Sequence, residues 1–406
     1  MRILRFFITR IFLKRWILVL GMILLLLLAN YLTFTTARSI ISTYQGYQEI
    51  ETLNQEGTII ANLDPDSETN TDKINIDETK KVYEYLNNNY TYALQVDGFV
   101  TSLDNEHDME VSVNYINEEA YKINQLRLSQ GNHLTFNYKM NEEKIPVLVG
   151  AGLAKTHPVG STIEITDPVT QQLVNLTVQG VLKKNTYRSN FYAPNSKNYF
   201  NFSIFLPVNE EFIQNAGLDL HVNGLMDIAL LDSTKEKAMN LKEHIYENVG
   251  LEFNFFNQQE NFDYFEEYYV YSLKIVCTIT FILLLIMVCL AIWNTLISIR
   301  LMIKDFTINL LVGLSYSKLR AIFYSYFGIL FSINLVILFA ITAFNRYGFW
   351  LRKDSIFATY GIFGLISMDW IAFLIVLFID IIIGFTIVEL TLKKIKRIPI
   401  SVGVLN

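Results

Sequence analysis

Apolar residues are concentrated in four long runs of this chain, while the remaining residues mix polar and apolar positions as soluble domains do. A helix rises about 1.5 Å per residue, so each run is long enough to cross the roughly 30 Å hydrocarbon core of a bilayer. We therefore predict four transmembrane helices, at about residues 16–34, 274–299, 319–344 and 370–391.

The segment between the first two runs has the pattern of an α+β domain. Strand-like alternation and helical periodicity predict β-α-β order near its start and again near its end, where Ser233 and Glu236 have the spacing of a capping box. Two such halves are typical of a ferredoxin-like lobe, here carrying a β-rich insertion at about residues 125–207. The expected strands are 57–63, 92–101, 109–116, 226–231 and 251–256, with 145–150, 162–166, 173–182 and 203–206 in the insertion, and the expected helices are 77–89 and 233–248.

A short charged link joins the second and third runs. Ile303, Phe306 and Leu310 recur at helical spacing and predict an amphipathic helix. Gly313 suits the end of that helix, and Ser315 can cap the next one. The pattern is compatible with a helix that merely rests on the membrane surface, and also with a lever that a second protein moves.

Charge divides the chain into two parts and sets its orientation. Residues 38–268 hold 34 Asp and Glu against 16 Lys and Arg, whereas the rest holds 5 against 17. Basic residues precede the first run, lie in the link and follow the last run, and such residues favour the cytoplasmic side. We therefore expect both termini in the cytoplasm and residues 38–268 outside. The Lys-, Asn- and Ile-rich residue usage indicates a bacterium, whose plasma membrane would then hold the chain.

The fold class that follows is an α-helical membrane protein with four transmembrane helices and an α+β extracytoplasmic domain. A cleaved signal peptide is the alternative for the first run, but its apolar core of about 19 residues is longer than usual. Both cysteines, Cys277 and Cys289, fall in the second run, so the outer domain is expected to have no disulfides. The expected parts are the N-terminus and first span 1–36, a stalk 37–56, the outer domain 57–258, a second stalk and span 259–299, the link 300–318, the third span 319–344, an outer loop 345–369, the fourth span 370–391 and a cytoplasmic tail 392–406.

Asp380 lies near the middle of the fourth run, where an ionisable group is costly unless it is paired or faces other helices. Its candidate partners are Asn30, Asn294 and Asn334. One hypothesis is a polar lock or proton-linked group between helices, and the other is an ordinary hydrogen-bonded packing residue.

Aromatic side chains crowd a stretch of the insertion that has little strand pattern. Exposed, they would suit contact with a substrate or partner; buried, they would simply fill the core. The residues in question are Tyr187, Phe191, Tyr192, Tyr199 and Phe200.

Three kinds of site find little support in the sequence. The acidic stretch 64–72 alternates oxygen ligands as a calcium loop does, but Asn75 stands where such a loop needs Glu, which favours a solvated loop. The histidines show no metal spacing, and neither a catalytic triad nor a phosphate-binding Gly-x-x-x-x-Gly-Lys-Ser/Thr motif is found. We expect no metal, no cofactor, no enzyme activity and no nucleic-acid partner for this chain.

Two stretches together resemble the MacB/FtsX-like family of ABC transporter permeases. The first comprises Ile-Pro-Val-Leu-Val-Gly-Ala-Gly-Leu-Ala at 145–154, Pro-Val-Gly-Ser-Thr-Ile at 158–163 and Leu-Thr-Val-Gln-Gly-Val-Leu at 176–182. The second is the link, where Lys304-Asp305 precedes an apolar helix that ends at Gly313, followed by Leu314-Ser315. The four-run layout with a large domain after the first run also matches.

The resemblance implies that a partner protein supplies the energy for movement. Permeases of this family pair as homodimers or heterodimers and bind two copies of a cytoplasmic ATPase, which holds ATP and Mg, and an accessory adaptor or substrate-delivering protein can join them in the lipid membrane. The implied function is export or extraction of a peptide, antibiotic or lipid-like substrate, with FtsX-like control of a cell-wall hydrolase or sensing of peptides as the alternative. The residues expected to couple to the ATPase are Arg300, Lys304, Asp305, Phe306, Leu310, Gly313 and Ser315.

Overall fold

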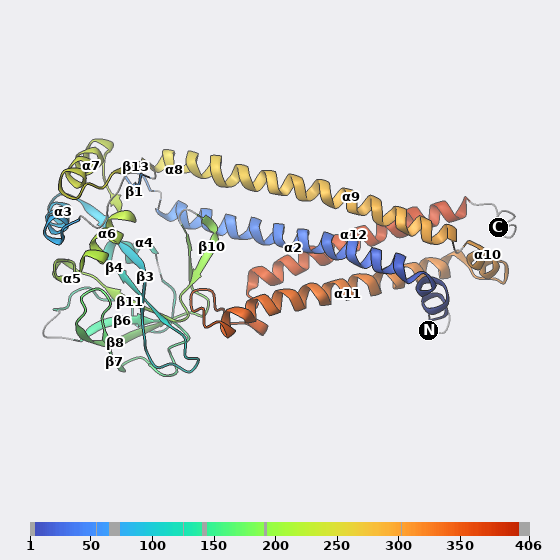
Figure 1. The fold of residues 1–406 in the computed structure, drawn as a ribbon, viewed down its shortest axis with the longest axis horizontal. Helices are drawn as coiled ribbons and strands as arrows, with labels where there is room; N and C mark the ends of the chain where they lie inside the picture. Colours follow the sequence, from blue (N-terminus) through green and yellow to red (C-terminus); the bar gives the residue numbers. More distant parts are fainter. Residues whose placement is uncertain are drawn as a thin grey trace. The chain divides into compact units, whose positions relative to one another are not determined.

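The computed structural model describes residues 5–53, 55–64, 74–124, 126–139, 144–190, 193–301 and 303–397. They form two compact units, which we describe separately (Figure 1). The helical unit comprises Met1–Ile41, Ser272–Asn345 and Leu365–Asn406. The sheet unit comprises Ser42–Tyr271 and Arg346–Gly364.

Four long helices form the helical unit, and each is long and apolar enough to cross a membrane, as predicted. Their packed faces form two apolar clusters, one around Phe323 and Ile387 and one around Phe34 and Leu338. A π-helical turn, Phe7–Phe12, and a 3-10 turn, Leu13–Arg15, come before the first long helix. The long helices are α2 (Trp16–Leu53), α9 (Tyr271–Leu301), α11 (Tyr316–Leu351) and α12 (Ser367–Lys396), with the short α10 (Ile303–Leu311) between α9 and α11.

The first lobe of the sheet unit is ferredoxin-like, as the sequence predicted. Its four strands lie in the order β13-β1-β12-β2, and every neighbouring pair is antiparallel. Figure 1 shows α3 and α7 side by side, each filling a β-α-β connection. Helix α3 forms because Asn75 caps it and because Val82 and Leu86 place a buried stripe at helical spacing. The elements are β1 (Ile59–Leu63), α3 (Ile76–Asn89), β2 (Thr91–Ala93), β12 (Ala229–Leu231), α7 (Lys235–Val249) and β13 (Phe253–Asn257).

The second lobe is built on a mixed sheet of seven strands in the order β3-β4-β11-β6-β8-β5, with β7 paired to β8. Helices α4, α5 and α6 follow or precede these strands in the chain, and β9 and β10 form a separate hairpin. The elements are β3 (Gln95–Thr101), β4 (Val111–Ile116), α4 (Glu118–Asn124), β5 (Leu128–Gly131), β6 (Ile145–Val149), β7 (Thr162–Thr166), β8 (Leu173–Leu182), β9 (Tyr187–Asn190), β10 (Ala193–Tyr199), β11 (Ser203–Pro207), α5 (Glu210–Asn215) and α6 (Leu218–Met226).

The insertion begins about 30 residues earlier than the predicted residue 125, because β3 and β4 belong to the second sheet. The expected single strand 92–101 is in fact two strands, and the chain changes sheets at the fully buried Leu94. Asn117 holds this crossing in place: its side chain accepts a hydrogen bond from Leu94 N (2.9 Å) and donates one to Tyr92 O (2.7 Å). These contacts join residues more than 20 positions apart, so no local sequence pattern predicts the change of sheet.

Two smaller boundaries also differ from the prediction. Met226 ends helix α6 instead of starting a strand, because Leu220, Val222 and Leu225 bury one face of that helix. The cap of α7 is Thr234 instead of Ser233, since Ser233 N donates to Gly57 O (2.8 Å) and the Thr234 side chain accepts from Lys237 N.

One apolar core runs through both lobes of the sheet unit. His221 lies between them and is fully buried. Its Nδ1 is 2.7 Å from Thr79 Oγ1 on α3, and its Nε2 is 2.7 Å from Ile213 O on α5. The two lobes are therefore joined by polar as well as apolar contacts.

The predicted outer loop 345–369 is largely part of the sheet unit. Helix α11 continues to Leu351, and the following residues pack into the core, where Ala358 is fully buried. Trp350 lies edge-on to Phe202, with ring centroids 5.7 Å apart, and Tyr199 N donates to Ile356 O (2.8 Å).

The two predicted stalks are helical and meet within the sheet unit. One is the end of α2, and the other is α8 (Gln258–Phe265), which opens with a capping box between Asn257 and Glu260. The Tyr47 ring lies 5.3 Å from the ring of Phe265. Aromatic residues of the second stalk therefore pack between helices.

Candidate functional site

The link between α9 and α11 is a helix, a sharp stop and a second helix start. Gly313 has φ +102°, a left-handed conformation that glycine adopts at little cost. Leu314 N donates to Asn309 O (2.9 Å), which closes the end of α10. Ser315 Oγ then accepts from Lys318 N (3.3 Å) and caps α11.

The structure brings the N-terminal aromatic residues to this stop. Phe6 and Phe7 line a groove of about 410 Å³ together with Gly313 and residues on either side of it. Val312 is 84% exposed, which is unusual for an apolar side chain and leaves it available to a partner. The groove is lined by Phe6, Phe7, Asn309, Val312, Gly313, Leu314 and Lys318.

Of the predicted coupling residues in the described part of the structure, Gly313 is the one that lines this groove. Ser315 caps the helix beside it, and Leu310 is half-buried. Arg300 is exposed at the end of α9. Lys304, Asp305 and Phe306 lie within α10, but their side chains are outside the described part of the structure. No pattern in the sequence connects Phe6 and Phe7 with the link, because they are about 300 residues from it.

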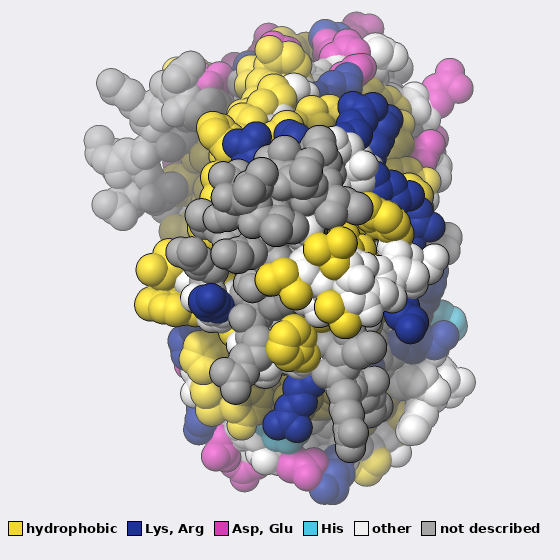
Figure 2. Space-filling view, turned by 90° about the vertical axis from the view of Figure 1, so that its right-hand side faces the viewer, with side chains coloured by type: hydrophobic (Ala, Val, Ile, Leu, Met, Phe, Trp, Pro, Cys, Tyr) yellow, Lys and Arg dark blue, Asp and Glu magenta, His cyan; other side chains and the backbone are white. Residues whose placement is uncertain are grey.

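Figure 2 views the end of the molecule that carries α10, where basic side chains lie among apolar ones. Exposed Lys and Arg side chains come from the link and from the last turn of α12. Such a face suits the polar, anionic headgroup region of a membrane. The exposed basic residues are Arg300, Lys318, Arg320, Lys393, Lys394, Lys396 and Arg397.

A polar pair lies within the helical unit. Asn30 Nδ2 on α2 donates to Asp380 Oδ2 on α12 (3.0 Å), and both side chains are almost completely buried. Asn294 is not the partner that the sequence allowed, because its Nδ2 donates to Leu18 O (2.9 Å). Asn334 on α11 is fully buried, and its amide atoms have no hydrogen-bond partner among the described residues.

Two ion pairs also join helices of this unit. Arg38 Nε on α2 lies 2.9 Å from Asp369 Oδ1 on α12, and the Asp369 side chain is fully buried. Arg320 Nη2 on α11 lies 3.0 Å from Glu389 Oε2 on α12, where both side chains are partly exposed.

The aromatic stretch of the insertion is mostly core rather than exposed surface. Tyr199 and Phe200 are about 5% exposed, and Phe200 lies edge-on to Phe205 at 4.8 Å. Tyr187 is half-buried in the β9–β10 hairpin. Of the two alternatives, core filling therefore holds for Tyr199 and Phe200, which are not exposed contact residues, while Phe191 and Tyr192 lie outside the described residues.

Gly150, in the stretch that resembles MacB permeases, has a packing role. A Cβ on Gly150 would lie 2.1 Å from Phe200 O and 2.3 Å from Asn201 O. Only glycine permits this close approach of two backbones. The stretch thus seats residues 200–202, which in turn contact the 346–364 segment: Asn201 Nδ2 donates to Ala358 O (2.9 Å).

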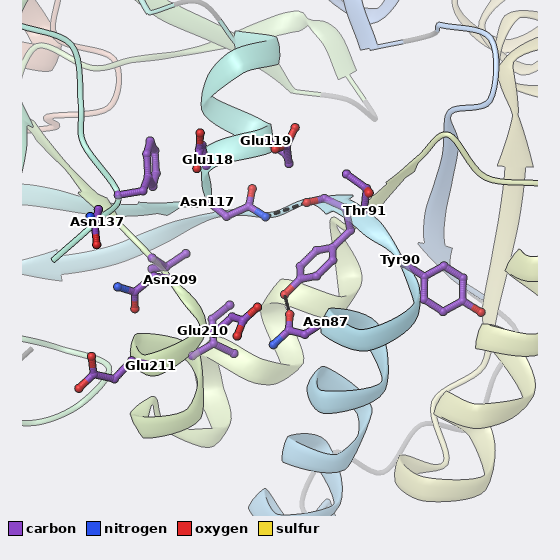
Figure 3. Close-up of a pocket in the computed structure, with 14 residues that line it drawn as sticks. Asn87, Tyr90, Thr91, Asn117, Glu118, Glu119, Asn137, Asn209, Glu210 and Glu211 are labelled. Atoms are coloured by element: carbon purple, nitrogen blue, oxygen red, sulfur yellow. Dashed lines mark hydrogen bonds between the residues drawn. The ribbon is translucent and has the colours of Figure 1, made fainter. Parts of the chain in front are cut away.

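A cleft of about 600 Å³ lies where the two lobes of the sheet unit meet (Figure 3). Its described lining carries four glutamates and no basic residue. Glu118 and Glu119 open α4, and Glu210 and Glu211 open α5, positions where carboxylates interact favourably with a helix N-terminus. Lys122 also pairs with Glu119 (2.8 Å). The acidity of the cleft therefore has a structural explanation, and we assign no ligand to it.

The acidic stretch 64–72 lies almost entirely outside the described residues. Asn75, just after it, accepts from Asp77 N (3.0 Å) and serves as the cap of α3. Within the described part of the chain, no group of three His, Cys, Asp or Glu side chains could hold a metal ion.

Comparison with known proteins gives one family and several similar structures. A family model described as MacB-like periplasmic core domain matches residues 18–236, more than half of the chain. The extracellular domain of the ABC-type transporter YknZ from Gram-positive bacteria is 16% identical, with a TM-score of 0.32, over 49% of this chain and 100% of that one. The periplasmic region of MacB from Actinobacillus actinomycetemcomitans is 13% identical, with a TM-score of 0.33, over 53% and 95%. No curated protein sequence matches the chain.

Proposed function

This chain belongs to the MacB-like family of ABC transporter permeases, and from that premise we propose that it transmits movement from a separate cytoplasmic ATPase to its extracytoplasmic domain. The chain is a multi-pass membrane protein, and its sheet unit is the extracytoplasmic domain. ATP binding and hydrolysis in the partner would move the link, and the helices on either side of the link would carry that movement across the membrane.

The groove at Gly313 is the observation that supports this proposal most directly. It combines an exposed apolar residue, Val312, with a cationic one, Lys318, on a rigid helix–stop–helix element. Apolar contacts with a charged rim are what a docking protein requires. A movement imposed at this point would act on α9 and α11 together, because the link is covalently part of both.

The partners follow from the family. We propose two copies of an ABC ATPase, which would hold ATP and Mg, and a second permease as homodimer or heterodimer, with both termini and the link in the cytoplasm. An accessory adaptor at the extracytoplasmic domain belongs to the same proposal. The transported or extracted substrate would be a peptide, an antibiotic or a lipid-like molecule at the outer face.

The test is a substitution that places a charge in the groove without disturbing the fold. Val312→Asp puts a carboxylate on an exposed residue of the groove, and Ser317→Asp, the matched control, puts one on an exposed residue of the first turn of α11, outside the groove lining. Full-length protein is purified from its native membrane, the copurifying ABC ATPase is identified by mass spectrometry, and vanadate-sensitive ATP hydrolysis is measured.

We expect wild type and Ser317→Asp to retain the ATPase and its activity, and Val312→Asp to lose both. Wild-type protein that carries no ABC ATPase would refute the proposed function. A Val312→Asp variant that retains the ATPase at the wild-type level would refute the groove as its docking site.

A further inference from the structure

The β9–β10 hairpin contacts two segments that are remote from it in the sequence. One is the end of α2, which continues the first apolar helix. The other is the 346–364 segment, which contains the end of α11 and the residues after it, and where Ile356 O accepts from Tyr199 N of β10 (2.8 Å). All three belong to the sheet unit.

The hairpin is held to α2 by a compact group of polar contacts. Ser189 N donates to Glu49 Oε2 (2.6 Å). Lys197 Nζ donates to Ser189 Oγ (3.1 Å), lies 3.9 Å from Glu49 Oε1 and sits 4.0 Å from the ring centroid of Tyr187. Lys197 is only 6% exposed, and lysine is rarely buried unless it is paired.

Burial affects the chemistry of this lysine. It lowers the pKa of Lys197 to about 8, against the opposing effect of the Glu49 charge. The ion pair with Glu49 is long, at 3.9 Å, and keeping the charge of Lys197 in this buried place costs free energy, so the net stabilisation by this pair is smaller than the Coulomb attraction alone.

The base of the hairpin is held to the 346–364 segment by neutral contacts. Asn185 Nδ2 donates to Tyr360 O (2.7 Å), and Asn185 Oδ1 accepts from Tyr360 N (2.7 Å), so one side chain satisfies both backbone groups. Asn201 Nδ2 donates to the buried Ala358 O (2.9 Å) and to Asn185 Oδ1 (3.1 Å). This attachment is fully hydrogen-bonded and lies against the core.

We propose that the β9–β10 hairpin is a cross-brace that joins the α2 stalk to the connection between α11 and α12, and that Lys197 and Glu49 are the positioning residues that hold its α2 end. The extracytoplasmic domain would then receive movement from the first and from the third and fourth membrane helices as one. The base of the hairpin, at Asn185 and Asn201, would stay attached to the 346–364 segment, and the end at Lys197 would be the one that can detach from α2. The role of the brace in transmitting movement rests on the proposed function, whereas the brace itself rests on the contacts described above.

The test uses the full-length protein with its ATPase in lipid nanodiscs and follows backbone hydrogen exchange. The variants are Lys197→Met, which keeps the length of the side chain without its charge, and Glu49→Gln, which keeps an acceptor for Ser189 N. Lys235→Met is the matched control, because Lys235 pairs with Glu260 (2.6 Å) on the same unit but away from the hairpin. Thermal unfolding of each variant shows whether the whole domain has changed.

Without nucleotide, we expect Lys197→Met to speed exchange in the hairpin by about tenfold and Glu49→Gln by less, because hydrogen bonds to charged groups contribute on the order of a factor of ten in local opening. Exchange in β6 and β8 should stay unchanged. With a non-hydrolysable ATP analogue, wild type should change exchange in the hairpin and in the 346–364 segment together. Lys197→Met should lose this joint response while the complex still hydrolyses ATP.

Each outcome decides a separate point. Equal hairpin exchange in wild type and Lys197→Met without nucleotide, or an equal effect of Lys235→Met, would overturn the brace. A joint nucleotide response that survives in Lys197→Met would overturn its coupling role. A wild type that shows no nucleotide response at all would instead count against the proposed function, and the exchange measured without nucleotide would still decide the brace.

Discussion

Gly150 shows how a missing side chain can determine the position of another backbone segment, the turn at residues 200–202. Adding a single methyl group there would drive it into Phe200 O, at 2.1 Å, and Asn201 O, at 2.3 Å. Neither backbone can move freely, because Phe200 and Asn201 are buried. The residue matters for packing rather than for turn geometry.

We predict that Gly150→Ala lowers the free energy of unfolding by about 1–3 kcal/mol, the usual cost of overpacking. Urea unfolding of the detergent-solubilised protein, followed by tryptophan fluorescence, measures it. Gly348→Ala is the control, because a Cβ there meets only Arg352 Nη1 at 3.5 Å and the site lies within helix α11. Equal loss in both variants would contradict the backbone-contact argument.

His221 makes the stability of the sheet unit depend on pH. Burial lowers the pKa of His221 below the usual 6.5, so the folded protein keeps it neutral while the unfolded chain takes up a proton. The free energy of unfolding should therefore fall as pH drops below about 6.5, by up to about 1.4 kcal/mol per pH unit.

Urea unfolding between pH 7.5 and 5 measures this slope. We expect His221→Gln to be less stable at pH 7.5 and to lose part of the slope, whereas His133→Gln, at an exposed histidine, should keep the wild-type slope. An unchanged slope in His221→Gln would assign the pH dependence to other groups.

At the residue scale, the sequence predicted the roles that depend only on residues nearby in the chain. Gly313 and Ser315 were identified because a helix stop and a cap are local chemistry. The sequence offered three asparagines as candidate partners of Asp380, and the structure selects Asn30. The contact between Lys197 and Glu49 could not be predicted, because it joins positions about 150 residues apart.

At the scale of elements, two ion pairs of the same chemistry connect helices to α12 in different surroundings. Asp369 is fully buried beside Arg38, whereas Glu389 and Arg320 are partly exposed. Without Arg38, the buried charge of Asp369 would lose its ion pair and keep the hydrogen bond that it accepts from Ile366 N (3.1 Å), whereas an exposed charge is still hydrated.

We therefore predict that Arg38→Met lowers the free energy of unfolding by about 3–5 kcal/mol and that Arg320→Met lowers it by about 0–1 kcal/mol. Thermal unfolding in detergent should show a large fall in Tm for the first variant and little change for the second. Similar shifts in both would mean that burial of Asp369 does not control the strength of this pair.

The sequence predicted elements well where periodicity was regular and poorly where the chain changes sheets. Strands β7 and β8 match their predicted bounds because their apolar and polar positions alternate. The β9–β10 hairpin was missed because its residues are polar or aromatic and show no alternation. The early start of the second lobe was not predicted, because β2 and β3 are consecutive in the chain. The contacts that hold the crossing between the two sheets come from the distant Asn117.

At the scale of the whole molecule, acidic and basic residues are unevenly distributed, as expected for a chain whose parts lie on opposite sides of a membrane. Residues 38–268 carry an excess of acidic residues, and the remainder an excess of basic ones. We predict that the sheet unit faces outward and the link faces the cytoplasm.

Cysteine labelling tests this orientation. In a background with Cys277 and Cys289 replaced by Ser, Gln172→Cys should react with a membrane-impermeant maleimide in intact cells, and Ser317→Cys only after permeabilisation, since both positions are exposed. Labelling of both in intact cells would refute the topology.

The buried place of Ala358 has a consequence for biosynthesis. Residues 42–271 leave the ribosome before the helix that leads to Ala358 has been made, so Phe202 lacks its contact with Trp350 until the third membrane helix is made. At about 5–20 residues per second, this interval lasts several seconds to roughly 20 seconds. During that time the domain lacks part of its core, so its folding can be completed only after the third membrane helix is in place.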